Sequence, residues 1–195
     1  MQSSPKITVL AVLCTTLAID CLGQEGVKPA PGRSDVATSP TKPAQSLPDT
    51  FVSILSEIKA KSQIPVLLPS ELSDPFGTAK HAVVEEISDD EYAIALYYEL
   101  GAGDAGFAAW FGARSNPDFG PQNIGNIRKV KLSHGLVGYV RPVSCGGSCA
   151  PANIWWKYGR VLYQIQLRFP STLREGDQQK AIIAAADSAI LAGPR

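Results

Sequence analysis

The feature that most constrains the fold is an alternation of side chains with a period of two. Between 160 and 169, apolar residues occupy the odd-numbered positions from Val161 onward, while most even-numbered positions are polar. Segment 92–100 alternates in the same way, with Tyr92 and Leu100 at its ends. Residues two apart share one face of a β-strand. Both segments are therefore predicted to be antiparallel strands with a buried face and a wet face.

Further strands and two helices complete the predicted architecture. The other strand-like segments are 80–87, 107–113, 127–132, 136–143 and 153–158, joined by turns rich in Gly, Asn and Pro. Helical spacing of Phe51, Ile54 and Ile58 predicts a helix that begins near Pro48, with Ser46 or Asp49 as its cap, and ends before Pro65. A second helix is expected over 175–191. The fold class is α+β: an antiparallel sheet of about six to seven strands flanked by an N-terminal and a C-terminal helix.

The N-terminal residues have the pattern of a secretory signal. Lys6 precedes an apolar run over 7–19, which Asp20 ends before it reaches the length of a membrane-spanning helix. We expect cleavage near Gly23, so that 1–23 is a signal peptide and the mature chain is extracytoplasmic, either periplasmic or secreted. An uncleaved anchor and a lipidated Cys21 are the alternatives.

The mature chain is expected to hold one globular domain behind a flexible linker. Residues 24–47 are rich in Pro and Ser and almost free of large apolar side chains, so they are predicted to be a disordered linker. Residues 48–195 then form a single α+β domain, which is a typical length for one core.

Two cysteines remain after the signal. Cys145 and Cys149 enclose a short Gly-rich loop, and in an oxidising compartment the expected pairing is a disulfide. A redox pair and half of a metal site are the alternatives. A redox pair usually has two intervening residues rather than three, and a metal site would need further ligands, for which only His81 and His134 are available.

Charge and motifs argue against several classes of function. The chain has 18 basic and 18 acidic residues, so we expect no nucleic-acid partner, and membrane contact only through the signal or a lipid anchor. Residues 101–106 match G-x-G-x-x-G, but the aromatic stretch after them indicates a strand instead of a phosphate-binding helix. A hairpin loop is the better interpretation, and no cofactor or metal is expected.

Candidate catalytic residues do not form a recognisable constellation. Acidic clusters such as Asp89-Asp90-Glu91 fall in polar turns, and Glu99 is expected on a sheet face or edge. No nucleophile motif accompanies His81 or His134. A modest basic zone (Arg128, Lys129, Lys131, His134 and Arg141) is interpreted as a solvated sheet face, with contact to an anionic partner as the alternative.

Aromatic residues on the predicted strands offer a candidate binding surface. If Tyr97, Trp110 and Trp155 share the outer face of the sheet, they form an exposed patch. Such a patch would suit a protein, a peptide or a glycan of the cell envelope.

The C-terminal third resembles a group of bacterial extracytoplasmic domains. Segments 137–140, 154–165 (IWWKYGRVLYQI) and 184–190 (AAADSAI) resemble the ending of uncharacterised domains that occur in lipoproteins and in the outer portions of membrane-bound regulators. The resemblance implies an antiparallel sheet closed by a C-terminal helix, and it carries over no catalytic residue.

The sequence therefore predicts an exported non-enzymatic binding or interaction domain of the bacterial envelope whose ligand is unknown. An exported hydrolase with an unrecognised active site is the alternative. Convergence of Glu99, Asp118, His134 and the 145–149 loop in one deep pocket would favour the hydrolase.

Overall fold

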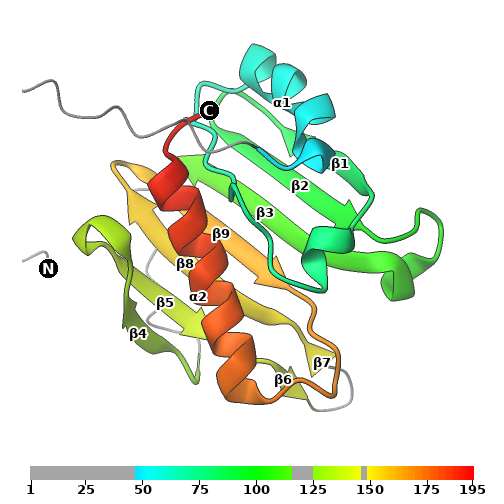
Figure 1. Ribbon diagram of the computed structural model, residues 1–195. Coiled ribbons are helices and arrows are strands. Elements are labelled where there is room, and N and C mark those ends of the chain that lie inside the picture. The colour runs from blue at the N-terminus through cyan, green and yellow to red at the C-terminus, as the bar shows by residue number, and fades with distance from the viewer. Residues whose placement is uncertain (1–46, 116–124, 146–148) are drawn as a thin grey trace, which may run out of the picture. The chain divides into compact units, whose positions relative to one another are not determined.

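The computed structural model describes residues 47–115, 125–145 and 149–195. The expected signal peptide (1–23) and nearly all of the expected linker (24–47) lie outside the described residues, as does Asp118. The described chain forms a seven-stranded antiparallel sheet with one helix before it and one after it, which confirms the predicted α+β class (Figure 1).

The sheet is built from strands that are neighbours in space but not always in sequence. Its order is β1-β2-β3-β9-β8-β5-β4. The strands are β1 (His81–Ile87), β2 (Glu91–Tyr97), β3 (Phe107–Ser115), β4 (Arg128–Lys131), β5 (Val137–Arg141), β8 (Ala152–Tyr158) and β9 (Val161–Leu167). A separate two-stranded ribbon, β6 (Ser144–Cys145) and β7 (Cys149–Ala150), branches off between β5 and β8.

Both helices pack on the same face of the sheet. Helix α1 (Asp49–Lys61) lies over the β1 side, where the ring of Phe51 contacts that of Phe111 edge-to-face at 5.3 Å. Helix α2 (Glu175–Ala192) crosses β8 and β9 (Figure 1) and buries Ile182 and Ile190. The opposite face, on which the described residues place no helix, is called the helix-free face below.

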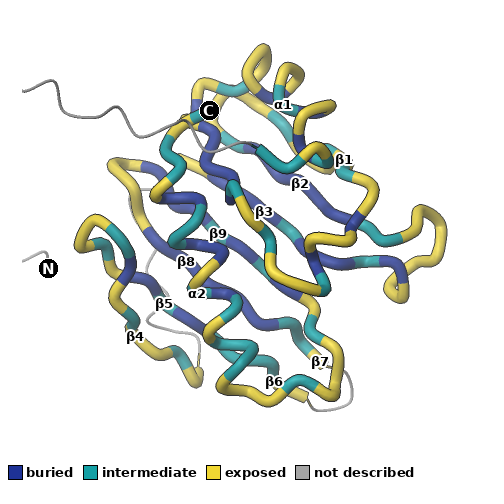
Figure 2. The backbone as a smooth tube through the Cα atoms, in the orientation of Figure 1, coloured by how far each residue is buried: buried dark blue, intermediate teal, exposed yellow. Residues whose placement is uncertain are grey.

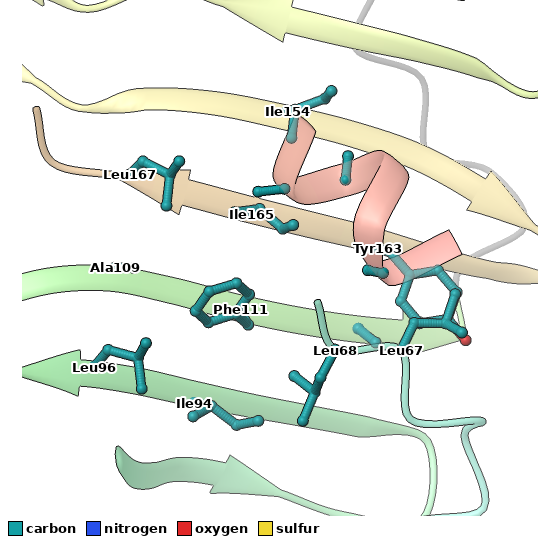
Figure 3. Packing of buried hydrophobic residues seen from close by; sticks show 14 of the residues in the cluster. Leu67, Leu68, Ile94, Leu96, Ala109, Phe111, Ile154, Tyr163, Ile165 and Leu167 are labelled. Atoms are coloured by element: carbon teal, nitrogen blue, oxygen red, sulfur yellow. The ribbon is translucent and has the colours of Figure 1, made fainter. Parts of the chain in front are cut away.

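The core lies between the sheet and the two helices. Inward side chains of β2, β3, β8 and β9 meet an extended segment, 64–68, whose Leu67 and Leu68 lie beside them in Figure 3. Burial is correspondingly highest along the central strands and the inner side of α2 (Figure 2). Two buried tyrosines fix the segment: the Leu67 N–H donates to Oη of Tyr92 at 3.2 Å, and Oη of Tyr163 donates to the Pro65 carbonyl at 2.7 Å.

Helix α2 also holds two distant segments through its polar side chains. Asp187 accepts a hydrogen bond of 2.6 Å from the N–H of Ser133, in the turn η4 (Ser133–Gly135) between β4 and β5. Ser188 Oγ accepts from the N–H groups of Ser70 and Glu71 at 3.1 and 3.2 Å. Asp187 and Ser188 both belong to segment 184–190 of the resemblance noted in the sequence. These contacts give that segment a structural role.

Three details differ from the sequence-based expectations. Strand β2 ends at Tyr97 rather than at residue 100, because its register with β3 shifts between Leu96 and Tyr97. Glu99 is therefore an exposed turn residue and not a sheet residue. Helix α1 has Pro48 at its N-cap without a side-chain hydrogen bond, so Asp49 does not cap it, and Ser46 lies outside the described residues.

Candidate functional site

The three candidate aromatic residues share the helix-free face. Trp110 pairs with Ala95 on one side and Gln166 on the other, while Trp155 pairs with Gln164. These positions alternate with buried inward residues, so their side chains project from the face opposite the helices. Tyr97 pairs with Phe107 on the same face, and their rings meet at 5.9 Å.

The three side chains do not form the exposed patch that their shared face would suggest. Trp155 is only 5 % exposed, and the guanidinium of Arg141 lies over its ring at 5.6 Å. Trp110 is half-buried, with its indole lying over the α-carbon of Gly112. Tyr97 is half-buried too, and donates a hydrogen bond of 3.1 Å to Glu85. Trp110 lines a small pocket of about 100 Å³, whereas Tyr97 borders a larger concave surface.

That concave surface is a hollow of about 1300 Å³. One wall comes from the outward side of the β1–β2 hairpin, with Val83, Glu85 and Tyr97. The floor and rear come from the end of β9 and the residues after it, including Gln166 and Phe169. The hollow therefore brings together two segments that are about 70 to 85 residues apart in the sequence, the β1–β2 hairpin and the end of β9.

The Gly-rich turn forms the second wall of the hollow. Residues 98–106 join β2 to β3 and end in a short 3₁₀ turn, η2 (Gly103–Gly106), directly followed by the strand. This geometry confirms the predicted hairpin loop over the dinucleotide interpretation. Arg168 of the β9 end donates to the carbonyl of Asp104, so the turn is attached to the floor. Leu100 of this turn and Phe107, the first residue of β3, line the hollow.

The cysteine ribbon forms the facing wall. Sγ of Cys145 and Sγ of Cys149 lie 2.09 Å apart, the distance of a disulfide bond, and the two residues pair across β6 and β7. Both cysteines are exposed and both line the hollow. An isolated ribbon of two residue pairs has little stability of its own. The cross-link therefore supplies much of what keeps this wall in place, and it suggests an oxidising environment.

Apolar side chains exposed to solvent set the chemistry of the hollow. Leu100 is 54 % exposed and Val83 38 % exposed, and both line it beside Tyr97 and Phe107. Partial burial raises the pKa of Tyr97, and its hydrogen bond to Glu85 and the charge of that carboxylate raise it further, so the phenol stays protonated as a donor. Polar and charged side chains, among them Glu85, Gln166 and Arg168, line the hollow beside these apolar ones. A combination of apolar surface and oriented polar groups is typical of ligand sites.

The other sequence candidates lie apart from the hollow. Among the described residues, neither Glu99 nor His134 lines it. His134 occupies the left-handed region (φ 57°) in the turn η4 between β4 and β5. Convergence of Glu99, Asp118, His134 and the 145–149 loop would have favoured a hydrolase. Of the described residues among them, Cys145 and Cys149 line the hollow.

Sequence reasoning missed Leu100, Val83 and Arg168 as members of one site. The period-two pattern assigned Leu100 to the buried face of a longer strand. The glycines directly after Leu100, Gly101 and Gly103, were the sequence signal that could have placed this leucine in a turn instead of a strand.

Within the described ranges, no group of three or more His, Cys, Asp or Glu side chains is placed to hold a metal ion. Neither described helix has the length and apolar character needed to cross a bilayer. Comparison with models of known families, with curated proteins and with solved structures gave no significant match.

Proposed function

We propose that the mature chain is a non-enzymatic binding domain of the bacterial envelope, periplasmic or secreted after cleavage near Gly23, whose hollow receives an apolar segment of a peptide or protein partner. The observation that carries the proposal is the cluster of solvent-exposed Val83 and Leu100 beside Tyr97 and Phe107. The disulfide-distance cysteine pair and the resemblance to extracytoplasmic domains support the location.

An apolar peptide side chain suits this site better than a sugar does. Burying the exposed faces of Leu100 and Val83 against another aliphatic or aromatic group gains about 25 cal/mol per Å² of apolar surface. A sugar hydroxyl placed on the same surface would lose hydrogen bonds to water. Tyr97, Gln166 and the backbone of the Gly-rich turn can meet the polar backbone of a peptide.

The composition of the hollow also supports binding over hydrolysis. Its described carboxylates are Glu85, which accepts from Tyr97, and Asp104, whose carbonyl accepts from Arg168. No described histidine lines the hollow, and its two cysteines are cross-linked. These contacts organise the walls. The hydroxyl that they pair with a carboxylate is the phenol of Tyr97, whose raised pKa keeps it protonated and therefore a poor nucleophile.

A displayed library of random peptides, selected against the purified oxidised mature chain, tests the proposal. Selected peptides are expected to be rich in apolar residues and to lose about tenfold or more in affinity for Leu100→Glu, because a charge would then occupy the apolar wall. The matched control is Leu191→Glu, at a 45 % exposed leucine of α2 outside the hollow.

Fluorescence anisotropy with labelled peptides gives the affinities, and mass spectrometry of the same mixtures detects cleavage. Equal binding to the Leu100→Glu and Leu191→Glu variants, or no enrichment of any peptide, would remove the hollow as the site. Cleaved peptides would favour the exported hydrolase instead.

A further inference from the structure

The hollow carries a negative charge that its described residues do not balance. Its charged lining residues are two carboxylates, Glu85 and Asp104, and one guanidinium, Arg168, so their charges sum to −1. Among the described residues, no cation lies within ion-pair distance of either carboxylate. A charge of one sign beside an apolar binding surface favours a partner of the opposite sign.

Asp104 and Arg168 offset one another, which leaves the negative charge at Glu85. The guanidinium of Arg168 donates to the backbone carbonyl of Asp104, so a cation already lies beside that residue. Glu85 stands on the other wall, formed by β1 and β2. Its side chain accepts one hydrogen bond, from the phenol of Tyr97, and a neutral donor does not cancel the charge of a carboxylate.

A β-bulge and the phenol hold the carboxylate of Glu85 at the hollow. The register of β1 with β2 shifts between Val84 and Glu86, so Glu85 is the extra residue of the bulge. Val83 and Glu85 both line the hollow, while Val84 between them packs against the core. A side chain that is already positioned loses less conformational entropy when it binds a partner.

Two aromatic rings stand next to this carboxylate. The ring centres of Tyr97 and Phe107 are 5.9 Å apart, and the planes of the two rings meet at 74°. Ring faces attract cations, and the aliphatic stem of a lysine or an arginine packs on apolar surface while its charged end stays polar. A basic side chain therefore matches the rings, Val83 and the carboxylate of Glu85 together.

Other charges of the β1–β2 hairpin do not supply the missing cation. Lys80 and His81 precede Val83 in the chain, and neither lines the hollow. Glu86, which pairs with Ala93, adds a second exposed carboxylate on the outward side of the hairpin. The potential around Glu85 is thus made more negative by its neighbour, which attracts cationic groups.

We propose that the peptide segment received by the hollow carries a basic side chain next to its apolar residue, and that Glu85 is the residue that selects it. This inference rests on the proposed function and adds the charge of the partner to it. A bound metal ion is a poorer match for the same charge, because such an ion needs several oxygen ligands and the described part of the chain groups no three acidic, His or Cys side chains for one.

Selection of displayed random peptides on three forms of the oxidised mature chain tests the inference. Peptides selected on the unmodified chain are expected to be enriched in Lys and Arg beside apolar residues. On Glu85→Gln the apolar enrichment should remain and the basic enrichment should disappear, because glutamine keeps an acceptor for Tyr97 without the charge. On Glu85→Lys, Asp and Glu should replace the basic residues.

Glu86→Gln is the matched control, since it removes the adjacent carboxylate, which does not line the hollow. Fluorescence anisotropy then measures the charge preference with a selected peptide and its copy in which the basic residue is glutamine. That replacement is expected to weaken binding about fivefold on the unmodified chain and on Glu86→Gln, and less than about twofold on Glu85→Gln.

The outcomes separate this inference from the proposed function. Apolar peptides without basic enrichment, or an equal loss of affinity on Glu85→Gln and on the unmodified chain, would overturn the role of Glu85 and leave the proposed function standing. An equal loss of basic enrichment on Glu86→Gln and Glu85→Gln would also overturn it. Absence of apolar enrichment on every form would remove the proposed function, and this inference with it.

Discussion

The indole ring of Trp110 lies over the α-carbon of Gly112, two residues further along the same strand. A β-carbon added at Gly112 would stand 2.0 Å from Cη2 and 2.5 Å from Cζ3 of the ring. Gly112→Ala is therefore expected to displace the indole and to lower the free energy of unfolding by about 1–3 kcal/mol. Denaturant unfolding followed by tryptophan fluorescence measures both effects.

Gly176→Ala is the matched control for that substitution. A β-carbon at Gly176, in the first turn of α2, meets no atom within 4 Å. It is expected to leave the stability unchanged or to raise it slightly, because alanine favours a helix. Equal losses from Gly112→Ala and Gly176→Ala would show that the contact with the indole is not the cause.

The sequence predicted the strands because their alternation is a local property. The odd-numbered residues of β9, from Tyr163 to Leu167, face the core as expected. The sheet order could not be predicted, because β3 is followed in the chain by β4 but pairs with β9 in space. The even-numbered face of β9 was expected to be wet, yet Leu162 is only 5 % exposed. Burial of that face depends on contacts with residues distant in the sequence, which the alternation of residue types within one strand does not reveal.

The candidate site was only partly predictable for a related reason. The cysteine pair and the Gly-rich turn could be recognised as separate short motifs. Their position as facing walls of one hollow depends on β3, β9 and β8 lying between β2 and β5. Strand β2 ends at Tyr97, which leaves Leu100 exposed in the turn, whereas the period-two pattern extends the strand to that residue.

Alkaline pH is expected to destabilise the domain through Tyr92 and Tyr163. Burial raises the pKa of both phenols far above the ordinary value of 10. Below pH 10 both states keep these protons, so the stability is fully present. Above pH 10 the unfolded chain loses them while the folded chain retains them. Stability should then fall by about 1.4 kcal/mol per pH unit for each tyrosine. Urea unfolding between pH 8 and pH 12 measures this slope.

Phenylalanine variants separate the two tyrosines. Tyr163→Phe removes a hydrogen bond to the Pro65 carbonyl and should cost about 1 kcal/mol at pH 7. It should also make the fall of unfolding free energy above pH 10 less steep, by the roughly 1.4 kcal/mol per pH unit that one tyrosine contributes. Tyr139→Phe, at a half-buried phenol of β5, is the control and should leave the decline as it was. An unchanged slope in Tyr163→Phe would contradict the assignment.

Reduction of the cysteine pair is expected to loosen the ribbon without unfolding the sheet. Dithiothreitol can reach both sulfur atoms, since Cys145 and Cys149 are exposed. The closed loop is short, so its opening should lower the free energy of unfolding by no more than about 2 kcal/mol. Amide exchange of Ala150 in the ribbon should speed up while that of Ile154 in β8 stays protected. Affinity for peptides selected on the hollow should fall. Cooperative loss of protection in both strands would show that the bond supports the whole sheet.

Ser188 is expected to contribute to stability through a contact far from the hollow. Its Oγ accepts hydrogen bonds from the N–H groups of Ser70 and Glu71, which attaches the segment after 64–68 to α2. Ser188→Ala leaves those donors without their acceptor and should cost about 1–3 kcal/mol in unfolding free energy. Ser53→Ala, at an exposed position of α1, measures the gain in helix propensity that both substitutions share. Since Ser188 does not line the hollow, peptide affinity should be the same in both variants. Helix α2 already contributes Gln178 to the hollow, so a loss of affinity without a loss of stability would instead extend the binding site along α2 to Ser188.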